Sequence, residues 1–137
     1  MTVSLNPYLH LDGGARDALA FYAGIFGGTP DMLTYAAMGM EGEHGEWLMH
    51  GYLGTPDGMQ LMVSDQLPGE EVAVGDGPRI ALSGDEPERL HGWFAALSEG
   101  GEVHVPLERQ MWGDVFGQVR DRFGTVWLVN IADASAE

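Results

Sequence analysis

Residues 8–28 read YLHLDGGARDALAFYAGIFGG, and residues 80–100 read IALSGDEPERLHGWFAALSEG. With an offset of 72 residues, the two stretches align an extended segment with an extended segment and a helical pattern with a helical pattern. Both stretches end on glycine, and Tyr22 falls on Phe94. Internal repetition at a fixed offset is the signature of a structural unit that occurs more than once. The sequence therefore predicts two copies of one module.

Apolar residues recur at helical spacing in the second part of each stretch, which predicts one buried stripe per helix. Glycine pairs follow both patterns and supply the left-handed conformation that commonly ends a helix. The two stripes consist of Ala18, Tyr22, Ile25 and Phe26 in the first copy and of Leu90, Trp93, Phe94 and Leu97 in the second.

Extended segments follow each predicted helix, and tight-turn signals precede the last segment of each copy. We therefore predict an α+β protein that forms a single domain over residues 1–137 and consists of two β-α-β-β-β modules. The predicted strands are 29–38, 46–54 and 58–65 in the first copy and 102–109, 112–121 and 125–131 in the second. Module 1 covers about residues 3–66, a linker rich in glycine and proline covers about 67–78, and module 2 covers about 79–131.

A β-α-β-β-β module leaves a curved mixed sheet with a helix on its outer face and a concave face without one. We expect the two sheets to form a cup lined by side chains from several strands. Sites for small ligands are usually concave and combine apolar walls with a few polar groups. A small-molecule ligand in this cup is therefore the expected partner.

Composition excludes several other partners. The chain has 137 residues and a formal net charge of −15, which repels nucleic acid and anionic membrane surfaces. It has no cysteine, so disulfides, thiolate metal sites and thiol nucleophiles are excluded. The first residues lack the pattern of a secretory signal, and no stretch is apolar enough to span a bilayer. We expect a cytoplasmic protein.

Two runs of sequence resemble a known family. The run YLHLDGGA at residues 8–15 and the closing run WGDVFGQVRDRFGTVWLVN at residues 112–130 are similar to the PhnB-like branch of the vicinal-oxygen-chelate superfamily, which includes glyoxalases, bleomycin-resistance proteins and dioxygenases. The resemblance implies paired β-α-β-β-β modules, a homodimer, and a cup that holds a divalent metal in many relatives. Relatives isomerise, cleave or oxygenate small molecules, or sequester antibiotics, and fold likeness alone does not choose among these functions.

The ligand positions implied by the resemblance do not carry the usual metal ligands. They fall on Pro7 and Arg79 on the first strands of the modules, and on Met62 and Leu128 on the last strands. Proline and leucine offer no side-chain donor, arginine stays cationic, and methionine sulfur prefers soft metals. A register slipped by two residues adds Gln60, whose single amide oxygen cannot hold a metal alone. We therefore predict no metal site and no cofactor.

The candidate residues of the cup are aromatic, polar or sulfur-containing side chains on predicted strands. Arg79 can bind an anion there, reach the rim, or pair with Asp114 or Glu108. Alternation places Trp112 and Phe116 on one sheet face, which is either the cup or the helix side. The full set of candidates is Tyr8, His10, His50, Gln60, Met62, Arg79, Trp112, Asp114 and Phe116.

Three functions remain open at this stage. The leading one is a small-molecule-binding protein without fast chemistry, lacking the usual metal site. The alternative is a metal-dependent lyase, isomerase or dioxygenase that uses a shifted site made by His10, His50 and either Asp12 or Asp65. The third is a structural dimer whose cup is filled by side chains. The sequence assigns no catalytic residue.

Overall fold

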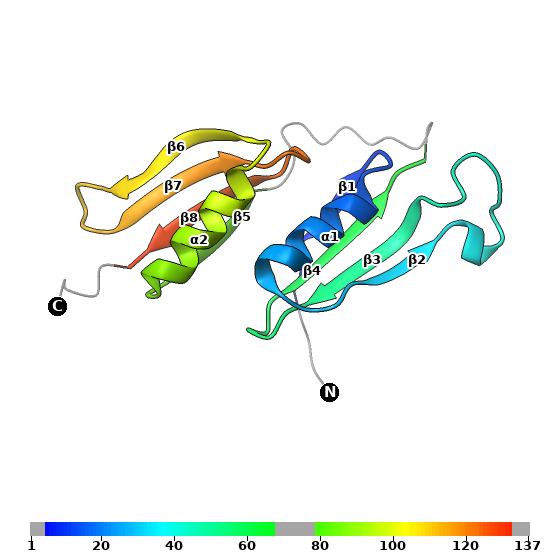
Figure 1. Ribbon diagram of the computed structural model, residues 1–137, viewed down its shortest axis with the longest axis horizontal. Coiled ribbons are helices and arrows are strands. Elements are labelled where there is room, and N and C mark those ends of the chain that lie inside the picture. The colour runs from blue at the N-terminus through cyan, green and yellow to red at the C-terminus, as the bar shows by residue number, and fades with distance from the viewer. Residues whose placement is uncertain (1–4, 68–78, 133–137) are drawn as a thin grey trace. The chain divides into compact units, whose positions relative to one another are not determined.

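The computed structural model describes residues 5–67 and 79–132. The chain divides into two compact units, residues 1–74 and 75–137, and each described unit has the element order β-α-β-β-β (Figure 1). The first unit contains β1 (Tyr8–Leu11), α1 (Ala15–Phe26), β2 (Asp31–Thr34), the 3-10 helix η1 (Ala36–Met38), β3 (Leu48–Gly54) and β4 (Gln60–Asp65). The second contains β5 (Arg79–Gly84), α2 (Pro87–Ser98), β6 (Glu102–Arg109), β7 (Val115–Arg120) and β8 (Val126–Ile131). The predicted α+β class and paired modules are confirmed.

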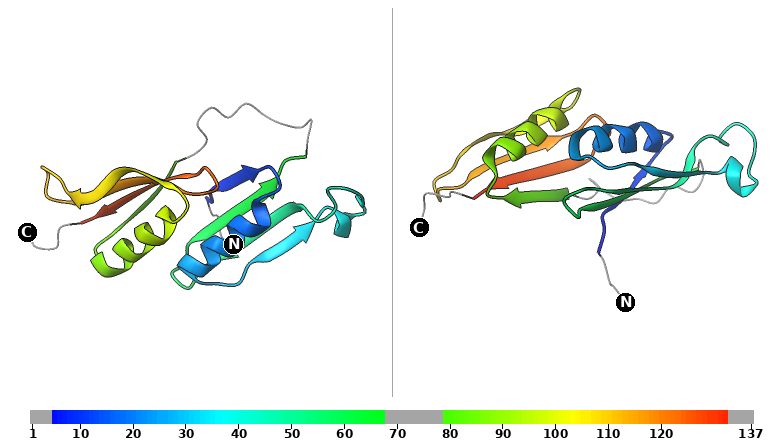
Figure 2. Two further views of the ribbon diagram at one scale, coloured as in Figure 1. Left: turned by 45° about the horizontal axis from the view of Figure 1, so that its top comes forward. Right: turned by 60° about the horizontal axis from the view of Figure 1, so that its bottom comes forward.

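The sheet of module 1 has the strand order β1-β4-β3-β2. Strands β1 and β4 are parallel, which the crossover through α1 requires, and the other neighbours are antiparallel. Helix α1 covers one face of this sheet (Figure 2). Its residues Leu19 and Tyr22 are fully buried, as are Leu53 and Val63 on the sheet. These side chains form the core of the module.

The sheet of module 2 repeats this topology with the order β5-β8-β7-β6 and a parallel β5–β8 pair. Helix α2 covers one face, where Phe94 and Leu97 are buried with Val119 and Val129. The aromatic ring of Phe94 lies so close to Gly117 that an added Cβ there would be 2.9 Å from it. A glycine on the central strand therefore lets the helix approach the sheet.

Module 1 has a glycine in the same place. A Cβ added to Gly51 would lie 2.7 Å from the Val63 side chain and 2.9 Å from Leu19 on α1. Gly51 and Gly117 thus mark the helix-covered face of β3 and β7. Because side chains alternate along a strand, the residues on either side of each glycine point to the face without a helix. This face is called the open face of each sheet.

The repeat offset differs between helices and strands. Helices α1 and α2 begin at Ala15 and Pro87, which are 72 residues apart, as the sequence alignment predicts. Strand pairing does not follow this offset. Met62 and Leu128 lie at matching places, four residues after the turn glycines Gly58 and Gly124.

The register then decides which first-strand residues correspond. Tyr8 pairs with Met62, whereas Ala81 pairs with Leu128, so Tyr8 corresponds to Ala81 at an offset of 73 residues. The predicted equivalence of Pro7 and Arg79 does not hold in the strands. The reason is that the connection from strand to helix is one residue longer in module 1.

Two predicted strands are shorter than expected. The segment 29–38 forms only β2 and then the 3-10 helix η1, which ends at Met38 and is followed by Gly39 with a φ of 96°. The segment 112–121 contributes only β7, because residues 110–113 form a turn in which Gly113 N–H donates to the Gln110 carbonyl over 3.0 Å. The predicted linker 67–78 lies, apart from Leu67, outside the described residues. No helix among the described residues is long and apolar enough to cross a membrane.

Candidate functional site

The open face of module 1 carries five of the predicted site residues. Sheet register aligns Tyr8 with Met62 and then with Tyr52, and aligns His50 with Leu33 on β2. These residues alternate with the helix-facing residues of their strands, so they point away from α1. The predicted residues on this face are Tyr8, His10, His50, Gln60 and Met62.

Three rings form a cluster on this face. The hydroxyl of Tyr8 lies 3.0 Å from Nδ1 of His50, and the two rings meet edge to face with centroids 5.6 Å apart. On the other side, the His10 ring stacks on Tyr8 with centroids 5.0 Å apart and planes inclined by 14°. Tyr8 thus connects an imidazole on β1 with an imidazole on β3, across β4. Stacked and edge-to-face pairs of this kind add stability beyond area burial.

Free polar atoms remain in this cluster. In the part of the chain that the structure describes, the side chain of His10 makes no hydrogen bond, and the side chain of His50 makes only the one to Tyr8. Tyr8 is 40% exposed and His10 is also exposed, while His50 is half-buried. The imidazole nitrogens are therefore available to a ligand on the open face.

Asp65, one carboxylate of the alternative metal site, is buried and hydrogen-bonded to the backbone. Its side chain is 1% exposed. One oxygen accepts the N–H groups of Gly13 and Ala15 over 2.7 and 3.0 Å, and the other accepts the N–H of Leu48 over 2.9 Å. The carboxylate therefore caps the N-terminus of α1 and ties it to β3. Asp12, the other carboxylate considered, is exposed just after β1.

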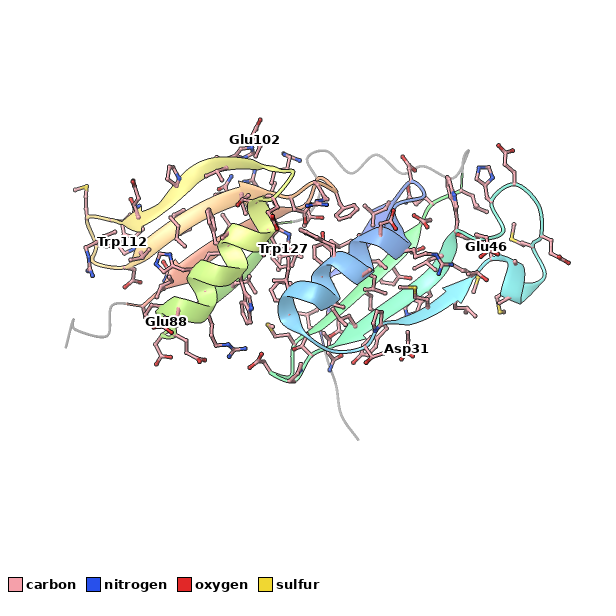
Figure 3. The ribbon with its side chains drawn as sticks, in the orientation of Figure 1. Asp31, Glu46, Glu88, Glu102, Trp112 and Trp127 are labelled. Carbon is pink, nitrogen blue, oxygen red and sulfur yellow. The ribbon has the colours of Figure 1, made fainter. Side chains whose placement is uncertain are left out.

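The open face of module 2 has a different character. Phe116 pairs with Asn130 and points away from α2. The Asn130 side-chain amide donates to Asp114 over 3.0 Å, which draws that carboxylate to this face even though it precedes β7. Trp112 lies in the turn between β6 and β7 (Figure 3). It is 64% exposed, and its ring centroid is 6.3 Å from that of Phe116.

The imidazole of His104 in module 2 already has hydrogen-bond partners within the protein. His104 Nε2 lies 2.8 Å from a Glu102 oxygen, and Gln118 Nε2 donates to His104 Nδ1 over 3.4 Å. Both ring nitrogens have partners, in contrast to His10 and His50. Sequence reasoning missed His104 and Gln118, because their contact depends on the register between β6 and β7.

Arg79 is the first residue of β5 and is exposed. Within the described residues it forms no ion pair, so the predicted pairing with Asp114 or Glu108 does not occur there. Its neighbour across the strands is Val126. Arg79 is therefore a solvent-exposed cation at the start of β5.

The donor set does not fit a divalent metal. The described residues hold no group of three or more His, Asp or Glu side chains placed to bind an ion. Pro7 precedes β1 and contributes only its carbonyl, which accepts the Met62 N–H over 3.0 Å. Arg79 and Leu128 offer no lone pair to a cation. We therefore derive no chemical step through a metal.

An open pocket of about 290 Å³ lies away from the predicted site, around the loop between β2 and β3. Its walls combine carboxylates with an imidazole that packs edge-on against Trp47, with ring centroids 4.3 Å apart. Sequence reasoning did not find this pocket, because the loop shows no periodic pattern. The lining residues are Tyr35, Met40, Glu41, Glu43, His44, Gly45 and Leu67.

Comparison with known proteins identifies the family. The model of the Glyoxalase/Bleomycin resistance protein/Dioxygenase superfamily matches residues 4–129. The chain belongs to this superfamily. The resemblance predicted from residues 8–15 and 112–130 is thereby confirmed. The match spans both modules of this glyoxalase-superfamily chain.

Individual relatives agree with this assignment. Protein YjdN of Escherichia coli is 26% identical over 144 residues, which cover 93% of this chain and 94% of YjdN. The solved structure of PA1353 from Pseudomonas aeruginosa is 33% identical, covers 95% of this chain and 98% of its own, and superposes with a TM-score of 0.84. The PhnB protein from Bacillus cereus shares the fold with a TM-score of 0.77 at 20% identity, covering 95% of this chain and all of its own.

Proposed function

We propose that this glyoxalase-superfamily protein binds a small, partly aromatic or amphipathic molecule on the open face of module 1, without a bound divalent metal. The observation that carries the proposal is the cluster of Tyr8, His10 and His50. Its three rings are in contact, and among the described residues both nitrogens of His10 and Nε2 of His50 have no hydrogen-bond partner. Flat aromatic surface combined with a few polar atoms is typical of small-molecule sites.

The neighbouring residues extend this surface. Met62 lies beside Tyr8 in the register, and its flexible thioether adapts to irregular ligand shapes. Tyr52 continues the same row on β3, and Gln60, whose register partner on β3 is Gly54, adds a side-chain amide. All three side chains are half-buried, so a ligand would contact them without unfolding the sheet.

Binding is favoured over metal-dependent catalysis by two features. Asp65 is 1% exposed and accepts three backbone N–H groups on the helix-covered side of β4, so it does not face the open face that carries His10 and His50. Of the ligand positions implied by the resemblance, Met62 and Leu128 lie at matching places on the last strands of the two sheets, and neither side chain is a donor for hard cations. A site made of aromatic rings and imidazole nitrogens is suited to recognising small organic molecules.

The proposal is tested by analysing protein purified without added metal and without chelator. Elemental analysis is expected to find far less than one zinc, nickel, manganese or iron atom per chain, and mass spectrometry of the native protein is expected to detect an organic ligand. The variant His50→Ala should lose that ligand, whereas His91→Ala, which removes an exposed imidazole from α2, should retain it. One metal atom per chain that disappears in His50→Ala would overturn the proposal.

A further inference from the structure

The two open faces differ in how their imidazoles are used. On module 2, His104 has Glu102 on one nitrogen and Gln118 on the other. On module 1, His10 has no hydrogen-bond partner in the described structure and His50 has one. A ligand that needs hydrogen-bond partners from imidazole therefore finds them on module 1.

The Tyr8 contact leaves one ring nitrogen of His50 for a ligand. The Tyr8 hydroxyl shares a hydrogen bond of 3.0 Å with Nδ1 of His50, and Nε2 has no partner among the described residues. A neutral imidazole that accepts at Nδ1 carries its proton at Nε2. In that tautomer, His50 presents an N–H donor from Nε2 to a ligand. His10 is not held by any hydrogen bond and can present a donor as well.

Charge on this face points in the same direction. Within the described strands of module 1, Asp31 is the one charged residue that the register places on the open face, and it lies on the edge strand β2. The chain as a whole has a formal net charge of −15. A face with two imidazoles and a single peripheral carboxylate is therefore a local area where an acidic ligand group meets little repulsion.

The stacked rings of His10 and Tyr8 indicate that the apolar part of the ligand is an aromatic ring. His10 and Tyr8 are nearly parallel, so an aromatic ring of a ligand extends an existing stack beside them. Tyr52 and Met62 border the same area. From donors, charge and stacking together, we infer that the ligand of this site is a small planar aromatic acid, whose carboxylate accepts hydrogen bonds from His50 Nε2 and His10. This inference rests on the proposed function and names its ligand class.

Three probes of one ring size test the ligand class: benzoate, benzamide and benzylammonium. Each is titrated into the full-length protein in the presence of chelator, and binding is followed through backbone amide resonances. Benzoate is expected to shift the resonances of β1, β3 and β4 and to bind about five-fold or more tightly than benzamide, because hydrogen bonds to a charged acceptor are the stronger ones. Benzylammonium is expected to bind more weakly than both.

Variants assign the effect to the imidazoles. Both His10→Ala and His50→Ala should remove most of the preference for benzoate over benzamide, while His91→Ala should leave it unchanged. None of the three side chains is buried in the core, since His10 and His91 are exposed and His50 is half-buried, and the amide spectrum verifies that each variant is folded.

The outcomes separate the two proposals. If all three probes bind equally at this face, the ligand class is wrong while the proposed function stands. If no probe shifts these resonances, or if they shift only elsewhere, both proposals are wrong. If the same resonances shift when the protein alone is diluted, a second copy of the chain covers the face, and both proposals are again wrong.

Discussion

Replacing Asp65 by asparagine isolates the role of a buried carboxylate that sequence alone left open as a metal ligand. The side chain is 1% exposed and accepts three backbone N–H groups at 2.7, 3.0 and 2.9 Å. Asparagine keeps one acceptor oxygen, but its amide N–H₂ must then face an N–H donor. The variant also removes a negative charge at the N-terminus of α1.

The expected loss follows from these contacts. A hydrogen bond to a charged group contributes about 1.5–3 kcal/mol, and the charge at a helix N-terminus adds about 0.3–1 kcal/mol. Asp65→Asn should therefore lower the free energy of unfolding by about 2–4 kcal/mol. The matched control is Asp12→Asn, which changes an exposed carboxylate close by and should stay within about 0.5 kcal/mol of the parent.

Urea denaturation followed by far-ultraviolet circular dichroism measures both variants. If Asp65→Asn unfolds at the same urea concentration as the parent, the carboxylate is not a structural cap, and the argument against its use as a site residue fails. If the exposed control loses as much as Asp65→Asn, the effect comes from net charge rather than from the three hydrogen bonds.

Further predictions concern packing, hydrogen bonding and assembly. Gly51→Ala should destabilise the protein by about 1–3 kcal/mol in the same assay, because its Cβ would meet Val63 at 2.7 Å. Gly24→Ala, at a position in α1 that faces open space, should stabilise the protein by up to about 1 kcal/mol. Equal effects of the two substitutions would contradict the packing argument. Trp127→Phe should cost about 1–3 kcal/mol, since the indole N–H donates to buried Asp121 over 2.8 Å, and an unchanged melting curve would count against that bond. The family resemblance predicts a homodimer, which sedimentation equilibrium would contradict by giving a monomer mass at micromolar concentration.

The helices and hairpins were predictable because their signals are local. Helix α1 spans Ala15–Phe26 as its apolar period indicates, and the glycine that follows, Gly27, has the expected positive φ of 88°. The start of β7 was not predictable from alternation alone. The turn before it depends on the hydrogen bond from the Gly113 N–H to the Gln110 carbonyl, and nothing in the alternating run WGDVF distinguishes turn from strand.

The composition of the open face of module 1 was predictable from strand alternation, but its chemistry was not. Alternation places Tyr8 and His10 on one face, yet only the three-dimensional register reveals that Tyr8 reaches His50 across β4. Asp65 ends the predicted strand 58–65, and the sequence alone left it open as a metal ligand. Its hydrogen bonds to the N–H groups of Ala15 on α1 and Leu48 on β3 become visible only when the elements are packed.

The most direct measurement of the central claim is metal dependence of ligand binding at the open face of module 1. Protein dialysed against chelator is mixed with a set of small aromatic fragments, and its amide resonances are recorded before and after divalent metal is restored. The account predicts that fragments shift resonances around Tyr8, His10 and His50 in chelator, and that restored zinc, nickel or manganese changes neither the shifted residues nor the affinities. Shifts that occur only after metal is added would contradict it.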